Sequence, residues 1–315
     1  MDSTGPAGQF NRAAWRGMER AAADLDVAVR WAETSGPDDQ DAEIGALVDD
    51  GCGLVITVGF ELAVATSEAA RHHPDVAFVI LDYPVGPFEP WGDPPPDNVA
   101  GVTFRVVDGA FLAGYLAAGV TETGVVGTYG SLPIAASTDF MEGFRLGAGH
   151  HDSVHGTVTR VLGWDGTSGD FIRTFDDMAA DRAATADLIA RGADVILPAA
   201  LPVSRGACEA ASEANAGGAE VRLVLTHTDL AARMPVCSPV ALASVVKDFE
   251  QMVVDAVAEF LRSGGVVASS EGNLANRGVV LGPFPPAPDV PAELAAELSE
   301  LAVAVAGGDL VPGEG

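Results

Sequence analysis

Apolar residues recur along this chain with two different periods, and short strand-like runs alternate with helical patterns throughout. Near the start, Trp15, Met18, Ala22 and Leu25 follow one another at helical spacing. The next apolar run, GLVITVG at 53–59, has the length of a buried strand and is bounded by glycines. By the same reasoning we predict further strands at 77–82, 101–104, 124–128, 157–162, 193–198, 221–226, 241–246 and 278–281. Helices are predicted at 61–72, from the 101–104 strand to about 119, and at 137–149, 176–191, 204–216, 248–263 and 291–306.

Strands that alternate with helices through short connections indicate parallel sheets covered by helices on both faces. A length of 315 residues suits two such lobes rather than one. The predicted fold class is therefore α/β, with two Rossmann-like lobes joined by three crossover segments near 103–105, 246–248 and 265–278. We expect 1–103 and 247–270 to form the amino-terminal lobe, and 104–246 and 271–315 to form the carboxyl-terminal lobe.

Ligands of open parallel sheets gather at the carboxyl ends of the strands, and several predicted strands end near a polar or aromatic residue. These residues are Gly59, Phe60, Asp82, Phe104, Asp229 and Lys247. For Asp82 alone, a role as a helix cap or turn residue remains an alternative.

Charge excludes some classes of partner. The sequence has 45 acidic residues against 17 basic ones, which gives a net charge of −28 and a pI near 4.2. Such a surface repels nucleic acid and anionic membranes. The composition leaves open whether the acidity is an adaptation to salt or reflects an acidic proteome that avoids lysine. No apolar run approaches the roughly 20 residues that span a bilayer.

The sequence carries no recognisable catalytic motif. It lacks GxSxG, a P-loop, HExxH, and a GxGxxG that follows a strand. The three cysteines are far apart in the sequence and form no CxxC pair, so we expect them to be free. Of the six histidines, we expect five to be solvated and only His227 to lie near a ligand. The pairs Asp38–Asp39 and Asp176–Asp177 fit a solvated face or a helix start. We therefore expect no catalytic residue, metal site or cofactor.

Six segments carry a resemblance to a known family. They are DSTGPAGQFNRAAWRGMERA at the amino end, VGFELAVATSEAARHHPDVAFVILD, NVAGVTFRVVDGAFLAGYLAA, GVVGTYGSLPIAASTDFMEGFRLGA, TFDDMAADRAATADLIARGADVI and ALASVVKDFEQMVVDAV. In this order they resemble the basic membrane protein family, the purine-nucleoside-binding lipoproteins of ABC importers. Each segment is weak evidence alone, but together they cover nearly the whole chain. The resemblance implies a type 1 periplasmic-binding-protein fold.

The resemblance also implies a ligand site for a purine nucleoside such as adenosine, guanosine or inosine. It suggests that Phe10 and Phe175 hold the base between them, although ordinary core packing is the alternative for both. Asn11 is a hydrogen-bonding candidate that would also suit a helix N-cap. The other candidates are Asp2, Gly59, Phe60, Asp82, Asp229 and Lys247, with Trp164 and His227 as secondary ones.

Other consequences concern partners and location. The resemblance implies an ABC permease as partner, a monomeric binding protein, and an extracytoplasmic location as a lipoprotein or periplasmic protein. The family's hydrophobic strand before the first Asp has no counterpart here, since Asp2 follows Met1, and we expect the export signal to lie upstream. Two other functions remain open. One is an intracellular sensor module with the same fold, and the other is a nucleoside hydrolase, for which no Asp cluster is recognisable.

Lys247 is the only lysine among the 17 basic residues. It ends a predicted strand and precedes Asp248, which together with Gln251 suits a helix N-terminus. A cation at that position disfavours the helix, so helix stability does not account for it. A ligand contact is the functional interpretation, because a compact ammonium fits where a planar guanidinium does not. Pairing with a nearby acid is the alternative.

Overall fold

The computed structural model describes residues 7–200, 204–227, 234–282 and 290–313. The chain divides into two compact α/β units. The first consists of Met1–Phe104 and Asp248–Gly272, and the second consists of Arg105–Lys247 and Asn273–Gly315. The chain therefore crosses between the units three times, and Lys247 is the last residue before the second crossing. No helix in the described ranges combines the length and the apolar character that crossing a membrane requires.

The first unit is built on a four-stranded parallel sheet with the strand order β1-β2-β3-β9. The strands are β1 (Leu54–Val58), β2 (Ala77–Leu81), β3 (Val99–Phe104) and β9 (Ser270–Gly272). The helices are α1 (Ala7–Leu25), α2 (Gln40–Asp49), α3 (Ala63–His72), which follows a single 3-10 turn at Phe60–Leu62, and α8 (Phe249–Ser263).

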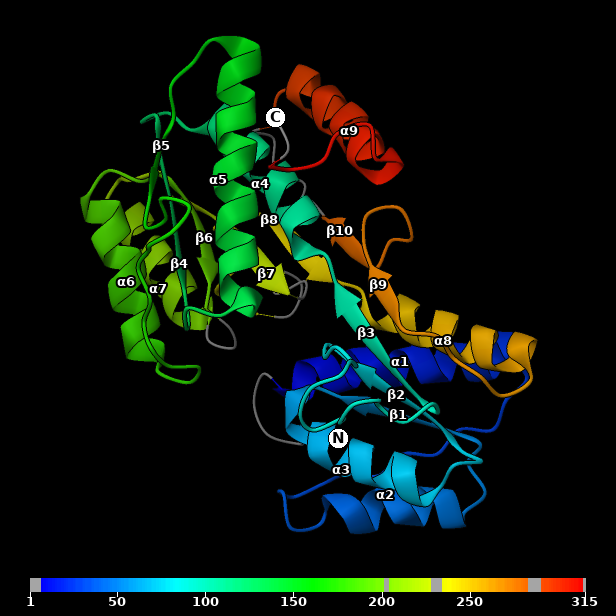
Figure 1. The fold of residues 1–315 in the computed structure, drawn as a ribbon. Coiled ribbons are helices and arrows are strands. Elements are labelled where there is room, and N and C mark those ends of the chain that lie inside the picture. The colour runs from blue at the N-terminus through cyan, green and yellow to red at the C-terminus, as the bar shows by residue number, and fades with distance from the viewer. Residues whose placement is uncertain (1–6, 201–203, 228–233, 283–289, 314–315) are drawn as a thin grey trace. The chain divides into compact units, whose positions relative to one another are not determined.

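Helices cover both faces of this sheet. Helices α1 and α8 pack on each other over one face, and α2 and α3 pack on each other over the other face (Figure 1). The first face buries Val79, Leu81 and Val253, and the second buries Phe78, Ile80 and Trp91. Strand β2 is buried along its whole length, as expected for an apolar strand between two helical layers.

The second unit is built on a six-stranded sheet with the strand order β10-β8-β7-β6-β4-β5. Its strands are β4 (Val125–Gly130), β5 (Arg160–Leu162), β6 (Val195–Ala199), β7 (Arg222–His227), β8 (Ala241–Lys247) and β10 (Val279–Leu281). All pairs are parallel except β10, which runs antiparallel to β8. The helices are α4 (Val106–Val120), α5 (Ala135–His155), α6 (Met178–Ala190), α7 (Ser204–Ala216) and α9 (Ala292–Gly307). Helix α4 packs on α5, and α6 packs on α7.

Helices α4 and α5 approach so closely that glycine is required where their backbones meet. A Cβ atom on Gly147 would lie 1.8 Å from the carbonyl oxygen of Phe111. A Cβ atom on Gly114 would lie 1.9 Å from the carbonyl oxygen of Phe144. Both distances are far below any van der Waals contact, so these two glycines set the distance between the helices.

A buried polar network links β4, α6 and α7. The Tyr129 hydroxyl donates to Asp181 Oδ1 at 2.5 Å, and the Ala207 N–H donates to Asp181 Oδ2 at 2.7 Å. Thr185 Oγ1 lies 2.8 Å from the same hydroxyl. Desolvation raises the pKa of Asp181 to about 7, although these hydrogen bonds oppose the shift. Burial likewise raises the pKa of Tyr129 well above its ordinary value.

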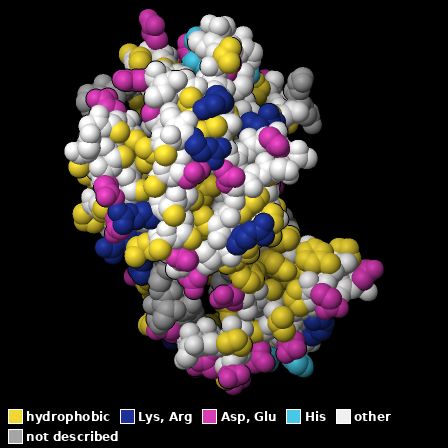
Figure 2. Space-filling model, turned by 90° about the vertical axis from the view of Figure 1, so that its left-hand side faces the viewer, with side chains coloured by type: hydrophobic (Ala, Val, Ile, Leu, Met, Phe, Trp, Pro, Cys, Tyr) yellow, Lys and Arg dark blue, Asp and Glu magenta, His cyan; other side chains and the backbone are white. Residues whose placement is uncertain are grey.

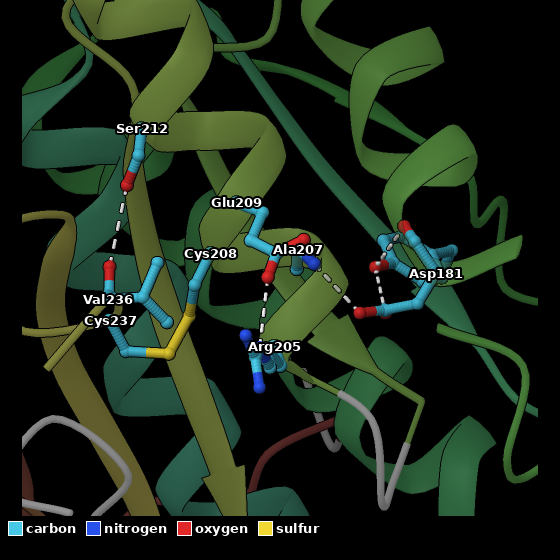
Figure 3. Close-up of a disulfide and its surroundings, with 9 residues drawn as sticks. Asp181, Arg205, Ala207, Cys208, Glu209, Ser212, Val236 and Cys237 are labelled. Atoms are coloured by element: carbon cyan, nitrogen blue, oxygen red, sulfur yellow. Dashed lines mark hydrogen bonds and ion pairs between the residues drawn. A yellow bond between two sulfur atoms is a disulfide. The ribbon is translucent and has the colours of Figure 1, made fainter. Parts of the chain in front are cut away.

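Two of the three cysteines form a disulfide, so the expectation that all three are free is wrong. Cys208 in α7 and Cys237 ahead of β8 are bonded, and their Cα atoms lie 4.9 Å apart (Figure 3). Both are fully buried in the core of the second unit. The pairing was missed because the two lie 29 positions apart in the sequence, and only the packing of α7 against the sheet brings them together. Cys52 is free and partly buried.

The predicted fold class is confirmed, with several local differences. Helix α2 and strand β9 were not predicted, and β10 departs from the parallel arrangement. The acidic pairs do mark helix starts: Asp39 is the N-cap residue of α2, and Asp177 accepts from two backbone N–H groups at the start of α6. The predicted N-cap at Asp248 is also confirmed, since its carboxylate accepts from the Gln251 N–H at 2.9 Å.

Candidate functional site

In the first unit, the predicted site residues lie where the parallel strands end. Gly59 and Phe60 follow β1, Asp82 follows β2, and β3 ends at Phe104. Because these strands are parallel neighbours, their carboxyl ends share one edge of the sheet. Phe60 is 62 % exposed, so its ring is available to a ligand at this edge.

Contacts between aromatic rings link Phe10 of α1 to Phe104 at the carboxyl end of β3. Phe10 stacks on Phe249 with ring centroids 5.0 Å apart, and Phe249 in turn lies 4.8 Å from Phe104. Phe10 is only partly buried, whereas Phe249 is 1 % exposed. Asn11, the next residue in α1, is 6 % exposed. The core-packing interpretation of Phe10 therefore holds for its contact with Phe249, while part of its surface remains exposed.

The turns after β1 and β2 have a backbone shape that suits ligand contact. Gly59 has a φ of +88°, a conformation that glycine adopts without strain, and a Cβ there would meet nothing within 4 Å. Asp82 also lies in the left-handed region with a φ of +63°, which Asp tolerates better than most residues. Backbone N–H groups of Gly59 and Asp82 bond to the neighbouring strands at 2.9 and 2.7 Å. Both turns are thus fixed by the sheet.

In the second unit, Lys247 and His227 end two adjacent strands. Lys247 is 6 % exposed at the end of β8, and His227 is 5 % exposed at the end of β7. The His227 ring lies 4.5 Å from that of Phe140. Desolvation, and to a lesser degree the Lys247 charge, lowers the pKa of His227 well below its ordinary value. His227 is therefore a neutral imidazole beside a buried cation.

Asp139 joins this group, and the sequence analysis missed it. It lies in α5, one residue before Phe140, and its surface is exposed. Although Asp139 is exposed, the protein around its carboxylate displaces enough water to raise its pKa, while the positive charge of Lys247 acts to lower it. Asp139 is thus a carboxylate on which the charge of the lone lysine acts. The sequence signal that could have identified Asp139 is a carboxylate in the first turns of a helix that follows a strand end.

Trp164 and Phe175 lie on the loops beyond β5. The Trp164 Nε1–H donates to Glu142 Oε2 at 2.7 Å, and Arg145 holds the same carboxylate. Hydrogen bonds to Arg145, followed by that to Trp164, lower the pKa of Glu142 although burial opposes them. Phe175 is 40 % exposed, which does not fit the core-packing alternative. Asp2 and Asp229 lie outside the described residues.

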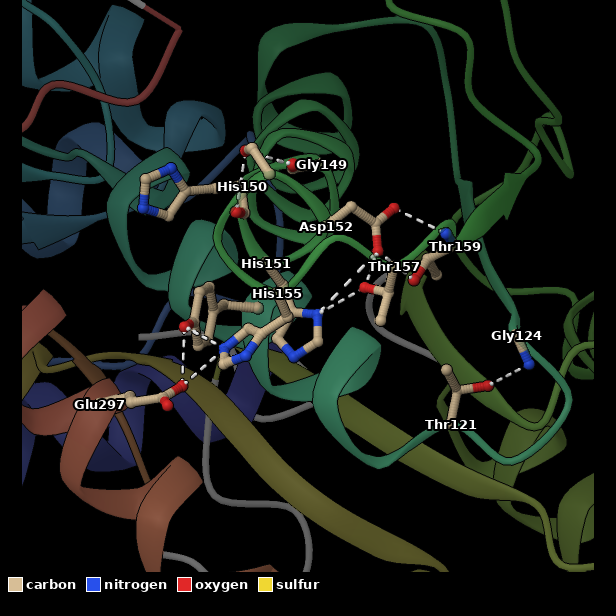
Figure 4. Close-up of polar contacts among 12 residues, drawn as sticks. Thr121, Gly124, Gly149, His150, His151, Asp152, His155, Thr157, Thr159 and Glu297 are labelled. Atoms are coloured by element: carbon tan, nitrogen blue, oxygen red, sulfur yellow. Dashed lines mark hydrogen bonds and ion pairs between the residues drawn. The ribbon is translucent and has the colours of Figure 1, made fainter.

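The expectation that five histidines are solvated is wrong for His151 on α5, whereas His150 is partly buried and His155 is exposed. His151 is 7 % exposed, and its ring packs edge-on against Tyr115 at 5.0 Å. His155 contacts Glu297 of α9 at 3.0 Å (Figure 4). The Tyr115 hydroxyl donates to the same carboxylate at 2.8 Å. Burial lowers the pKa of His151, and the Tyr115 hydrogen bond is the main cause of a lowered pKa at Glu297. This cluster secures α9 to α4 and α5.

Charge is dispersed over the part of the surface that can be seen in Figure 2. Acidic side chains there lie scattered among hydrophobic and basic ones rather than in one patch. Among the residues that the structure describes, no group of three or more His, Cys, Asp or Glu side chains is placed to hold a metal ion. Within the first unit the described candidate residues offer aromatic faces and the strand-end carboxylate Asp82, and within the second unit they include the buried cation Lys247.

Comparison with solved structures identifies the fold. A solute-binding protein of an ABC transporter from Conexibacter woesei matches with a TM-score of 0.74 and 22 % identity, over 98 % of this chain and 96 % of that one. A transcriptional activator of the comK gene from Bacillus halodurans matches with a TM-score of 0.78 and 21 % identity, over 96 % of both chains. At these identities the likeness shows the fold alone, and that fold is the periplasmic-binding-protein fold.

The family follows from the sequence. The family of PnrA-like ABC transporter substrate-binding proteins matches residues 7–281, so the chain belongs to this family, the basic membrane protein family. One relative is the ABC transporter nucleoside-binding protein BmpA of Lactococcus lactis, 26 % identical over 210 residues, which are 65 % of this chain and 55 % of that protein. The matched part spans between 48 and 62 % of the length of the curated relatives that it resembles. The predicted resemblance is confirmed.

Proposed function

We propose that this protein is the substrate-binding component of an ABC importer and that it binds a purine nucleoside. Both units contribute side chains to the ligand and close on it by bending at the three crossings. No covalent bond is made or broken. Membership of the PnrA-like family supports the importer, and the nucleoside-binding name of the Lactococcus relative supports the ligand class.

The observation that carries the proposal is the setting of Lys247. The chain's single lysine is buried at a strand end, beside neutral His227 and within the electrostatic reach of Asp139. A buried ammonium is costly unless it makes strong polar contacts. Three donors on a compact head can serve a ribose oxygen or a base nitrogen together with a carboxylate.

The other roles follow from the shape of a nucleoside. A purine base is a flat π-system, so we propose that the Phe10 ring stacks on it with the side opposite Phe249, and that Phe175 covers its other face. Carboxylates accept hydrogen bonds from ribose hydroxyls and base N–H groups, which we assign to Asp82, Asp2 and Asp229. The remaining proposed ligand contacts are Asn11, Gly59 and Phe60 from the first unit, and Trp164 and His227 from the second.

Isothermal titration calorimetry tests this assignment. Adenosine, guanosine and inosine are titrated separately into micromolar protein, and saturable heat is expected for at least one of them. Absence of heat for all three contradicts the proposal. Release of hypoxanthine from inosine during incubation would identify an enzyme and would also contradict it.

Lys247→Arg tests the residue that carries the argument. The planar guanidinium keeps the charge but does not fit the compact buried position, so we expect weaker nucleoside binding with a preserved fold. Arg262→Lys is the matched control, because the Arg262 side chain is 75 % exposed at the end of α8. Unchanged affinity in Lys247→Arg would remove Lys247 from the site.

We propose that the protein works outside the cytoplasm and delivers its ligand to an ABC permease. The Cys208–Cys237 disulfide supports this location, because such bonds persist in oxidising compartments. Alkylation in the native cells before isolation should modify only Cys52, which mass spectrometry of the isolated protein would show. Modification of all three cysteines would contradict the proposed location.

A further inference from the structure

Helix α9 is held on the second unit by an apolar stripe and by a polar cluster. It packs on α4, and its buried side chains are Leu294, Leu298 and Val305. Leu294 approaches α4 so closely that a Cβ atom on Gly119 would lie 2.6 Å from its Cδ2. Gly119 is the last residue but one of α4, so the start of α9 is seated at the carboxyl end of that helix.

The polar cluster brings titratable groups to the same end of α9. Three of the six histidines in the chain lie between positions 150 and 155 of α5. The rings of His151 and His155 have centroids 4.4 Å apart at an interplanar angle of 30° (Figure 4). His155 Nε2 lies 3.0 Å from Glu297 Oε2, and the Tyr115 hydroxyl donates to the same oxygen at 2.8 Å. The nucleoside site proposed above uses none of these side chains.

His151 is the most buried of the three histidines and lies against α4. Its Nε2 is 3.2 Å from the place that a Cβ atom on Gly119 would occupy, and its Nδ1 is 4.0 Å from an Asp152 oxygen. Burial, followed by the charge of His155, lowers the pKa of His151, while the charges of Asp152 and Glu297 oppose this shift. A protonated His151 is therefore disfavoured as long as α9 is seated.

The titratable neighbours of His151 come from three elements. They are Tyr115 of α4, His150, Asp152 and His155 of α5, and Glu297 of α9. Burial raises the pKa of Tyr115, which stays neutral in acid. Burial also lowers the pKa of His150, whose ring packs on two aromatic rings of α4 at 5.4 and 5.9 Å. His151 is the histidine that lies where Leu294 of α9 meets Gly119 of α4.

His151 and Glu297 both make the seating of α9 weaker in acid. On release His151 returns to its ordinary pKa of 6.5, so the stabilisation is complete above pH 6.5 and is lost as the pH falls below that value. The Tyr115 hydrogen bond is the main cause of the lowered pKa of Glu297, so this carboxylate adds a loss below its ordinary value of 4.5. The charge of His155 attracts Glu297 and repels a protonated His151, so it acts in both directions.

We propose that this cluster is an acid-operated latch for α9. When His151 takes up a proton, the first turns of α9 leave their seat at the carboxyl end of α4, while the sheet of the second unit stays folded. The inner faces of Leu294 and Leu298 and the surface around Gly119 then become accessible to water. The latch acts independently of the nucleoside site and of the proposed location, and purified protein is sufficient to test it.

Hydrogen exchange of the full chain, followed by mass spectrometry, tests the latch. Protection factors, which remove the effect of pH on the intrinsic exchange rate, are compared at pH 7.5 and 5.0 for Ala292–Gly307 and for β6 in the same unit. Protection of α9 should fall about tenfold, and at most about thirtyfold, the limit for one group whose pKa returns to 6.5 on release. Protection of β6 should not follow. Unchanged protection of α9, or an equal fall in α9 and β6, overturns the proposal.

His151→Gln removes the titrating ring and should abolish the fall in α9 protection. His72→Gln is the matched control and should keep the fall, because His72 is exposed on α3 of the first unit. A full fall in His151→Gln would assign the proton to another group and overturn the proposal. If His151→Gln does not fold, NMR titration of the unaltered chain replaces it. The His151 ring signals should then change over the same pH range as α9 exchange, and a separate range overturns the proposal.

Discussion

The contact between α4 and α5 allows a sharp test, because α5 carries two glycines in opposite environments. Gly147 faces α4, and Gly149 has nothing within 4 Å of an added Cβ. Both lie within the same helix, so replacement by alanine has the same helix-forming effect at each. Only the packing differs between the two variants.

The expected magnitudes have opposite signs. In Gly147→Ala the new Cβ would lie 1.8 Å from the Phe111 carbonyl oxygen and 2.8 Å from the Tyr115 backbone nitrogen. Both are backbone atoms of α4, so the helices must separate by roughly 1.5 Å to restore contact, which costs at least about 3 kcal/mol, the upper end for overpacking. In Gly149→Ala the loss of glycine flexibility stabilises the helix by about 0.5–1 kcal/mol.

Differential scanning calorimetry of the two variants beside the unaltered protein provides the measurement. At about 2–4 °C per kcal/mol for a unit of this size, Gly147→Ala should lower the melting temperature of the second unit by roughly 6–12 °C, and Gly149→Ala should raise it by roughly 1–4 °C. The reasoning is refuted if Gly147→Ala melts at or above the unaltered protein, or if both variants fall equally.

Three further predictions concern the second unit. Breaking the disulfide with Cys208→Ala and Cys237→Ala should lower the stability of this unit by about 3.6 kcal/mol, from the entropy of closing a loop whose ends lie 29 positions apart. Reductant should do the same to the unaltered protein, and equal chemical denaturation midpoints with and without reductant would contradict this. Burial raises the pKa of Asp181 from its ordinary value of 3.8 to about 7 in the folded state, so its protonation favours the folded state below pH 4 and this contribution is lost as the pH rises to 7. Asp181→Asn should therefore flatten the fall of the free energy of unfolding between pH 4 and 7. An unchanged slope would show that Asp181 does not titrate in that range. Tyr115→Phe removes the main hydrogen bond that lowers the pKa of Glu297, so a carboxyl NMR titration should show that pKa rising toward its ordinary value, and no change would assign the shift to the histidines.

Most of the fold could be predicted because strong periodicity coincides with burial. Helix α7 was predicted at 204–216 and is found at Ser204–Ala216, where small apolar residues line one buried face. Helix α2 was missed because Ile44 is its only buried residue, which leaves no apolar period to detect. Strand β9 reads SEG and has no apolar pattern at all. It exists only because Ser270–Gly272 pairs in register with Val102–Phe104.

The candidate site was predictable to the extent that strand ends are visible in sequence. Lys247 stood out by composition, and Gly59 and Asp82 by position. The structure places all three at strand ends, and Gly59 and Asp82 have the left-handed backbone described above. Asp139 could not be found in this way, because its significance depends on an electrostatic neighbour 108 positions further along the chain. Side-chain coupling of this kind, like the disulfide, depends on tertiary packing and leaves no local pattern.

The division of the chain also has a consequence for synthesis on the ribosome. The first unit needs α8 as the partner of α1 and β9 as the partner of β3, and both come from Asp248–Gly272. After Phe104 has emerged, the ribosome must translate all of Arg105–Lys247 before it reaches those elements. At about 5–20 residues per second this takes roughly 7–30 s, during which the apolar face of α1 that α8 will cover stays open. The first unit therefore completes its folding only after most of the second unit has been synthesised, and a chaperone or a delayed collapse would protect the apolar face of α1 during that interval.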